Sequence, residues 1–160
     1  MRILGVDLGK KRIGLALSDE SCEFAFPAGI LESRGRKRDI ASLRALISEK
    51  KIGEAVVGLP IHMDGRRGPE AENAIRFAEE LHEASGIPVD TLDERWTSQE
   101  AERLLAQAGS QRGAKRRKKG VVDEMAAAII LRTFLARKKN LPNSSTADSE
   151  PFLDEGTNTS

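Results

Sequence analysis

Apolar residues in the first part of the chain recur at the spacing of β-strands. Arg2 to Asp7 contains one short apolar run, which is typical of a buried strand. A Leu-Gly-Lys-Lys turn follows, and apolar positions alternate again from Arg12 to Ser18, so the two segments predict a hairpin. Phe24 to Leu31 predicts a third strand, in which Pro27 is tolerable only near a sheet edge or a bulge.

The middle of the chain alternates helical and strand patterns. Apolar positions from Arg38 to Lys50 recur at helical spacing, and Glu54 to Leu59 has the pattern of a buried strand. Gly68-Pro69 opens a second helix, which Gly86 is placed to cap, and Ile87 to Leu92 predicts a fifth strand. This order predicts an α/β fold: a five-stranded mixed sheet, three antiparallel strands and then two parallel ones, flanked by helices.

Two more helices are predicted after the fifth strand. Thr97-Ser98-Gln99-Glu100 has the spacing of a capping box, which predicts a helix that starts there and runs to about Gln107. A last helix is predicted from Val121 to Lys139, with Met125, Ile129 and Phe134 among its core contacts.

The composition is that of a soluble globular domain. Hydrophobic residues make up 39% and charged residues 32% of 160 residues, which suffices for one α/β core. The N-terminus enters a strand pattern directly, without the regions of a secretory signal, so we expect a cytoplasmic protein with no membrane partner. Cys22 is the single cysteine, which excludes an intrachain disulfide and favours a partly buried apolar role.

The net charge of +1 averages two unlike parts. Residues 141–160 carry four acidic and no basic residues, which leaves 26 basic against 21 acidic residues, about +5, on the rest. A basic body suits a polyanionic partner. The composition therefore predicts one folded domain over residues 1–139 and an acidic, disordered tail over residues 140–160.

Three acidic residues have the placement that a divalent-metal site needs. Phosphodiester hydrolysis requires an activated water and compensation of phosphoryl charge, which two metal ions about 4 Å apart supply, and Mg²⁺ prefers oxygen ligands. Asp7 ends the first strand, on the face that it shares with Ile3 and Gly5. The alternative is that Asp7 only forms a turn by accepting hydrogen bonds from the next amides.

Glu94 and Asp123 are the other two candidates. Glu94 directly follows the fifth strand, although its neighbour Asp93 is an equal rival, and one of the two could merely cap the next helix. Asp123 falls in the first turn of the last helix, where the macrodipole favours any acid. The small residues of 126–128 would let that helix approach the sheet closely, whereas Glu124 points about 100° away.

Basic residues stand near all three acids. A charge run is often only a solvated loop, but beside a carboxylate cluster it would bind a phosphate backbone and give salt-dependent affinity. The candidate nucleic-acid-binding residues are Lys10, Lys11, Arg12, Arg95, Arg112, Lys115, Arg116, Arg117, Lys118 and Lys119, which Arg66 and Arg67 could extend.

The remaining candidates carry weaker signals. Trp96 is expected in the core rather than as a base-stacking platform. His82 is expected to be exposed on the second helix, and His62 follows a strand end, where it could touch substrate. Two isolated histidines are a weak signal for zinc.

Taken together, these motifs resemble the YqgF family, described as pre-16S ribosomal RNA nucleases and as Holliday-junction-resolvase-like. The matching pieces run in family order over residues 1 to about 138: Gly5-Val-Asp7-Leu-Gly9 with Arg12-Ile-Gly14, Val57-Gly58-Leu-Pro60 with Met63-Asp-Gly65, Asp93-Glu94-Arg95 with Thr97, and Val122-Asp123 with Ala126-Ala127. Each piece alone is weak, whereas the ordered set is specific.

The resemblance implies a ribonuclease H-like fold and a nuclease, dependent on Mg²⁺ or Mn²⁺, that matures the 5′ end of the small-subunit ribosomal RNA precursor. Asp7, Glu94 and Asp123 are then the catalytic acids and metal ligands. Two residues depart from the family: His62 stands where Asn is frequent, and Glu124 replaces a small residue.

Three alternatives stay open at this point. A junction-resolving DNA endonuclease would need a dimer, and the sequence does not decide between a monomer and a weak homodimer, nor whether ribosomal particles are partners. A non-catalytic RNA-binding assembly factor would keep the acids without cutting. The turn after Asp7 also resembles the first phosphate loop of actin-like sugar kinases, but the chain is too short for their second half.

Overall fold

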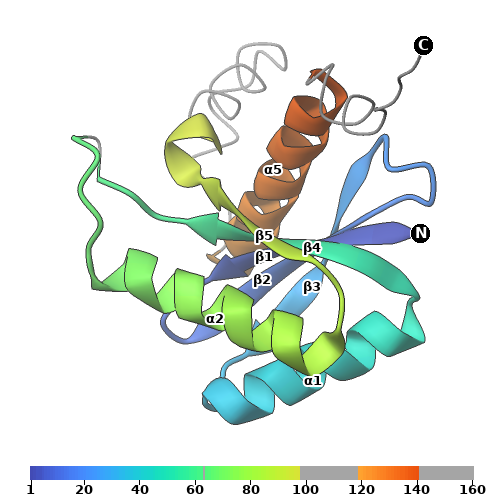
Figure 1. Ribbon diagram of the computed structural model, residues 1–160, viewed down its shortest axis with the longest axis horizontal. Helices are drawn as coiled ribbons and strands as arrows, with labels where there is room; N and C mark the ends of the chain where they lie inside the picture. The colour runs from blue at the N-terminus through green and yellow to red at the C-terminus, as the bar shows by residue number, and fades with distance from the viewer. Residues whose placement is uncertain (63, 98–118, 141–160) are drawn as a thin grey trace, which may run out of the picture.

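The fold is known from a computed structural model, which describes residues 1–62, 64–97 and 119–140 and, within the last range, the side chains of residues 125–139 only. Its helices and strands are β1 (Arg2–Leu8), β2 (Arg12–Ser18), β3 (Ala25–Glu32), α1 (Arg36–Glu49), β4 (Ile52–Leu59), α2 (Pro69–Ser85), β5 (Val89–Asp93) and α5 (Lys119–Asn140), as Figure 1 shows. All five predicted strands are present.

The strands form one mixed sheet in the order β3-β2-β1-β4-β5. β1 pairs antiparallel with β2, and β2 with β3, whereas β1–β4 and β4–β5 are parallel. The predicted arrangement of the sheet is therefore confirmed. Pro27 lies on the edge strand β3, opposite Ala16, where the register shifts, so its expected place at an edge or bulge is confirmed as well.

Helices cover both faces of the sheet, with α1 and α2 on one side and α5 on the other (Figure 1). Leu4 and Val6 of β1 pack in the core beneath α1 and α2. Ile3 packs on the opposite face against α5. This alternation follows from the two-residue period of a strand, and it places Asp7 on the α5 face.

α5 approaches the sheet very closely at Gly5. A Cβ atom on Gly5 would lie 2.8 Å from the Leu131 Cβ and 3.0 Å from the Ala127 carbonyl oxygen. Ala127 and Ala128 are buried in this contact, as the small residues of 126–128 predicted. Phe134 is buried too, but Met125 and Ile129 are only half-buried, so their predicted core role is only partly right.

Two helix ends lie where the sequence predicted them, and one helix begins at a different residue. α2 begins at Pro69, and Gly86 caps it in the left-handed conformation, as predicted. The predicted helix start at Thr97 is wrong, because residues 94–97 are already helical and the Thr97 hydroxyl donates to the Glu94 carbonyl at 2.7 Å. The capping-box partner Glu100 and the predicted course to Gln107 lie outside the described residues.

Within the described residues, no helix combines the length and the apolar character that crossing a membrane requires.

Candidate active site

Asp7 lies near the C-terminal end of β1, between two glycines. Its partner in β2 is Gly14, and the pairing of Val6 with Val57 places Gly58 of β4 on its other side. Since glycine has no side chain, neither neighbour of Asp7 in the sheet places a Cβ atom beside its carboxylate. The carboxylate therefore has room for a neighbour on the α5 face.

Glu94 fills that room from the end of the edge strand β5. Gly58 pairs with Leu92 of β5, and Glu94 follows β5 directly. A Cβ on Gly58 would lie 2.5 Å from the Glu94 Oε2 and 2.6 Å from the Ile130 Cδ1. The Glu94 carboxylate thus rests directly over the Gly58 backbone, and only glycine leaves space for it there.

The surroundings of Glu94 disfavour its charged form. Burial first, and then the negative charges of Asp7 and Asp93, together raise the pKa of Glu94 from 4.5 to about 7. Two carboxylates that repel each other in a half-buried place are what a divalent cation would stabilise, and both offer the hard oxygen ligands that Mg²⁺ or Mn²⁺ prefers. The residues present therefore fit such an ion.

The side chain of Asp93, the rival of Glu94, is hydrogen-bonded to Arg95. Its Oδ1 accepts the backbone N–H of Arg95 at 2.9 Å, and its Oδ2 accepts from the Arg95 guanidinium at 2.6 Å. The side-chain hydrogen bond of Arg95 lowers the pKa of Asp93 below its usual value. Asp93 is thus the cap of the turn that carries Glu94, and Arg95, expected to bind nucleic acid, is held by that cap.

A hollow of about 430 Å³ opens beside the two carboxylates. Asp7 and Glu94 line it together with Lys10, and the far wall comes from α1, α2 and the connection that precedes α1. The Arg36 guanidinium lies 5.6 Å from the centre of the Phe77 ring and donates to Glu80 at 3.3 Å and to the Asn73 side chain.

Sequence reasoning missed the far wall of this hollow. The residues concerned are Ser33, Arg36 and Asn73. The basic run from Arg34 to Arg38 was a signal for this wall, but nothing in the sequence placed that run beside Asp7.

The direction of α5 brings its first turns toward Asp7. Ile3 and Leu135 line one hollow, and Gly5 touches Leu131 and Ala127, so α5 runs back along β1. Asp7 lies two residues, about 7 Å, beyond Gly5 along the strand, and residue 123 lies one turn, about 6 Å, before Ala127 along the helix. The backbone of residue 123 is thus level with Asp7. The side chain of Asp123 lies outside the described part, and the described residues contain no group of three metal-ligating side chains.

The two histidines lie apart from the carboxylates. His82 is exposed on α2, as expected, and its Nδ1 lies 2.7 Å from the Ile87 carbonyl oxygen. His62 is exposed in a tight turn, in which its N–H donates to Arg66 and its carbonyl accepts from Gly65. Neither lines the hollow that holds Asp7 and Glu94.

The predicted basic residues divide into described and undescribed ones. Lys10 lines the carboxylate hollow, and Lys11 and Arg12 line a neighbouring one. Arg112 and residues 115–118 lie outside the described residues, and Lys119 is described as backbone of α5 only. The long basic run of the sequence therefore remains an expectation.

The prediction that Trp96 belongs to the core is wrong. Its side chain is 43% exposed, and the Arg137 guanidinium of α5 lies 4.0 Å from the centre of a Trp96 ring. The stack joins the turn that carries Glu94 to the outer part of α5. Cys22 is half-buried, as expected.

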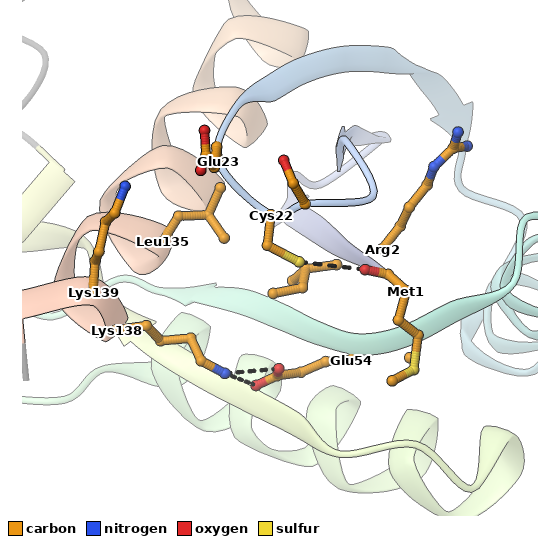
Figure 2. A pocket seen from close by; sticks show the side chains of 11 residues that line it. Met1, Arg2, Cys22, Glu23, Glu54, Leu135, Lys138 and Lys139 are labelled. Carbon is orange, nitrogen blue, oxygen red and sulfur yellow. Dashed lines mark hydrogen bonds and ion pairs between the residues drawn. The ribbon is translucent and has the colours of Figure 1, made fainter. Parts of the chain in front are cut away.

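A separate hollow lies at the opposite end of β1, away from the carboxylates (Figure 2). Lys138 of α5 donates to both carboxylate oxygens of Glu54 across it, at 2.9 and 3.1 Å, and the Cys22 thiol donates to the Met1 carbonyl. Glu54 is thus neutralised by Lys138, whereas Asp7 and Glu94 repel each other.

Comparison with known proteins agrees with this arrangement. A family model described as RuvX, Holliday junction resolvase, matches residues 1–137. A protein of Anaeromyxobacter sp. (strain Fw109-5), named "Putative pre-16S rRNA nuclease", is 47% identical over 135 residues, 84% of this chain and 96% of that protein. A protein of Thermoanaerobacter pseudethanolicus with the same name is 40% identical over 140 residues, 88% of this chain and 99% of that protein.

Two solved structures share the fold at low sequence identity. The RuvC protein of T. thermophilus in complex with a Holliday junction substrate has a TM-score of 0.57 and 16% identity, covering 88% of this chain and 97% of that one. The fowlpox virus Holliday junction resolvase has a TM-score of 0.51 and 16% identity, covering 86% and 99%. The predicted ribonuclease H-like fold is thereby confirmed.

Proposed function

This chain belongs to the RuvX family, described as Holliday junction resolvases, and from that premise we propose that it is a divalent-metal-dependent nuclease that cuts RNA. The observation that carries the proposal is the meeting of two carboxylates at one hollow. Asp7 and Glu94 line it together, and the charge of Asp7 contributes to the raised pKa of Glu94. A cation shared by the two would relieve this repulsion.

Each part of the chain has a separate task in this proposal. Asp7 and Glu94 hold Mg²⁺ or Mn²⁺, and Asp123, whose backbone is level with Asp7, is the third ligand. Bound there, the ions would supply charge compensation for the phosphoryl oxygens and an acidified water. Gly58 seats the Glu94 carboxylate, and the Asp93–Arg95 cap fixes the turn from which it projects.

RNA is the favoured substrate because of the names of the relatives. They cover nearly the whole chain and are named for pre-16S ribosomal RNA, so we infer a role in maturing the 5′ end of that precursor, in the cytoplasm. Lys10, Lys11 and Arg12, close to the carboxylates, are suited to phosphates of the substrate.

The test is cleavage of single-stranded RNA by the purified chain with Mg²⁺ or Mn²⁺. Asp7→Asn should abolish cutting without lowering the midpoint of urea unfolding, because it removes only the charge that holds the ion. Asp90→Asn, an exposed carboxylate on β5, is the matched control and should cut like the parent. Undiminished cutting by Asp7→Asn would reject the proposed site, and RNA binding with no cutting at any metal would favour a non-catalytic assembly factor.

A junction-resolving DNA endonuclease is the second candidate, which the description of the family favours. This activity requires two copies that present two sites to one branched substrate. Sedimentation and cleavage of a four-way DNA junction test it together. A monomer that leaves junctions intact while cutting RNA would exclude it.

A further inference from the structure

The carboxylate hollow continues into a second one. The first, of about 430 Å³, and a neighbouring one of about 470 Å³ share Lys10 and Ser33 in their walls. The second is also lined by Lys11, Arg12 and Glu32. The β1–β2 turn and the connection from β3 to α1 form its two sides, and the Ser33 N–H joins them by donating to the Lys11 carbonyl at 2.9 Å. A continuous surface depression thus leads from Asp7 and Glu94 to the start of α1.

The start of α1 is strongly basic. Arg34, Lys37 and Arg38 are exposed, and among the described residues none of their side chains forms an ion pair. Lys10 and Lys11 across the depression are exposed as well, also without an ion pair to a described residue. We call these five residues the basic track.

The acidic residues of the depression gather in the carboxylate hollow rather than in the second one. The Asp39 carboxylate is buried in the wall of the carboxylate hollow, where it accepts from the Ser33 hydroxyl at 2.6 Å and the Arg34 N–H at 2.9 Å. Glu80 is paired with Arg36, Glu70 lines the carboxylate hollow, and Glu32 lines the second one. In the wall of the second hollow the bases Lys10, Lys11 and Arg12 therefore outnumber the acid Glu32, and the exposed bases of α1 add to them from beside it.

These bases lie at a position where the macrodipole of α1 disfavours positive charge. Lys37 and Arg38 lie in the first turn of α1, where the positive end of the macrodipole disfavours cations. Stability of the helix therefore does not explain them. A run of charge on a helix is often simply solvated, but this run lies beside the depression that begins at the carboxylates.

We propose that the basic track binds the phosphates of the nucleic-acid strand where it leaves the carboxylate site. The strand then lies between the β1–β2 turn, with Lys10 and Lys11, and the start of α1, with Arg34, Lys37 and Arg38. The proposal rests on the nuclease function and adds to it the direction in which the substrate extends. Because the contacts are made to phosphates, the track binds regardless of base sequence.

The experiment compares two triple variants of the full chain in EDTA, where no cutting occurs. The track variant is R34A/K37A/R38A, and the control is R44A/K50A/R76A, three exposed bases on α1, its C-terminal cap and α2. Both remove three positive charges. The probe is a fluorescently labelled single-stranded oligouridylate, and the readout is the slope of log Kobs against log salt concentration.

Each phosphate contact to a single strand contributes about 0.7 to that slope, so the track variant should lose about 2 while the control keeps the slope of the parent. Urea unfolding should show that the track variant is folded, since alanine in the first turn relieves an unfavourable contact with the macrodipole. Equal slopes for track variant and control would overturn the proposal.

Failure of this inference is distinguishable from failure of the nuclease function. If Asp7→Asn stops cutting but the track variant keeps the slope of the parent, the function stands and the track is wrong. If the track variant loses slope while Asp7→Asn still cuts, the track stands as a binding surface and the catalytic assignment is wrong.

Discussion

Replacing Gly58 by alanine tests the geometry on which the site depends. The new Cβ would lie 2.5 Å from the Glu94 Oε2 and 2.6 Å from the Ile130 Cδ1, closer than non-bonded atoms approach. The Glu94 carboxylate is the end of a flexible side chain, so it is expected to move by about 1 Å to restore van der Waals contact. Ile130 of α5 is buried in the core, so its side chain can move less.

The magnitudes follow from these two contacts. Overpacking of this kind costs about 1–3 kcal/mol in the free energy of unfolding. Misplacing a group that holds a reacting centre by about 1 Å costs about 100-fold in rate. We therefore expect Gly58→Ala to remain folded at room temperature but to lose about 100-fold in kcat for RNA cleavage.

The assay pairs urea unfolding with single-turnover RNA cleavage. Gly53→Ala is the matched control, since Gly53 lies in the same strand but the three atoms nearest to its new Cβ belong to the flexible Met1 side chain, at the far end of the sheet. It should keep the rate of the parent. Parental kcat in Gly58→Ala would refute the reasoning that the Glu94 carboxylate needs the space over Gly58.

Three further predictions concern the surroundings of Glu94. Asp93→Ala removes the cap and should lower the free energy of unfolding by about 1 kcal/mol and also reduce cleavage, measured by urea unfolding and RNA assay. In EDTA, the folded pKa of Glu94, about 7, exceeds its ordinary 4.5, so the folded chain keeps a proton that the unfolded chain releases. The free energy of unfolding should thus fall as the pH rises from 4.5 to 7. Above pH 7 the urea midpoint of Glu94→Gln should be higher than that of the parent, and below pH 4.5 the two midpoints should be equal. Arg137→Ala should remove the stack on Trp96 and cost about 0.5–1 kcal/mol, with a change in tryptophan emission as the direct readout.

Much of the fold could be predicted from local pattern. The apolar run before Asp7 predicted a strand that ends at this residue, and Pro27 predicted an edge or bulge. Gly86 predicted the end of α2. These features depend on a residue's own dihedral angles, its missing N–H or the period of its neighbours, so a few consecutive residues suffice to determine them.

The candidate site was predictable only in part. Local pattern singled out Asp93 and Glu94 as rivals and could not separate them, and only the family resemblance favoured Glu94. The structure separates them through the Arg95 hydrogen bonds to Asp93 and the space over Gly58 for Glu94. The stacking partner of Trp96 is likewise Arg137, which is 41 positions away in the chain.

The sequence by itself thus determined which segments become strands and helices, and which acids stand at strand ends. The tertiary structure decided which of those acids meet, and it brought the start of α1 beside the β1–β2 turn. The physical reason is that backbone preference and hydrophobic period act between neighbours in the chain. Distances between side chains of different elements follow from how β1, β4, β5 and the helices pack together, which no single segment encodes.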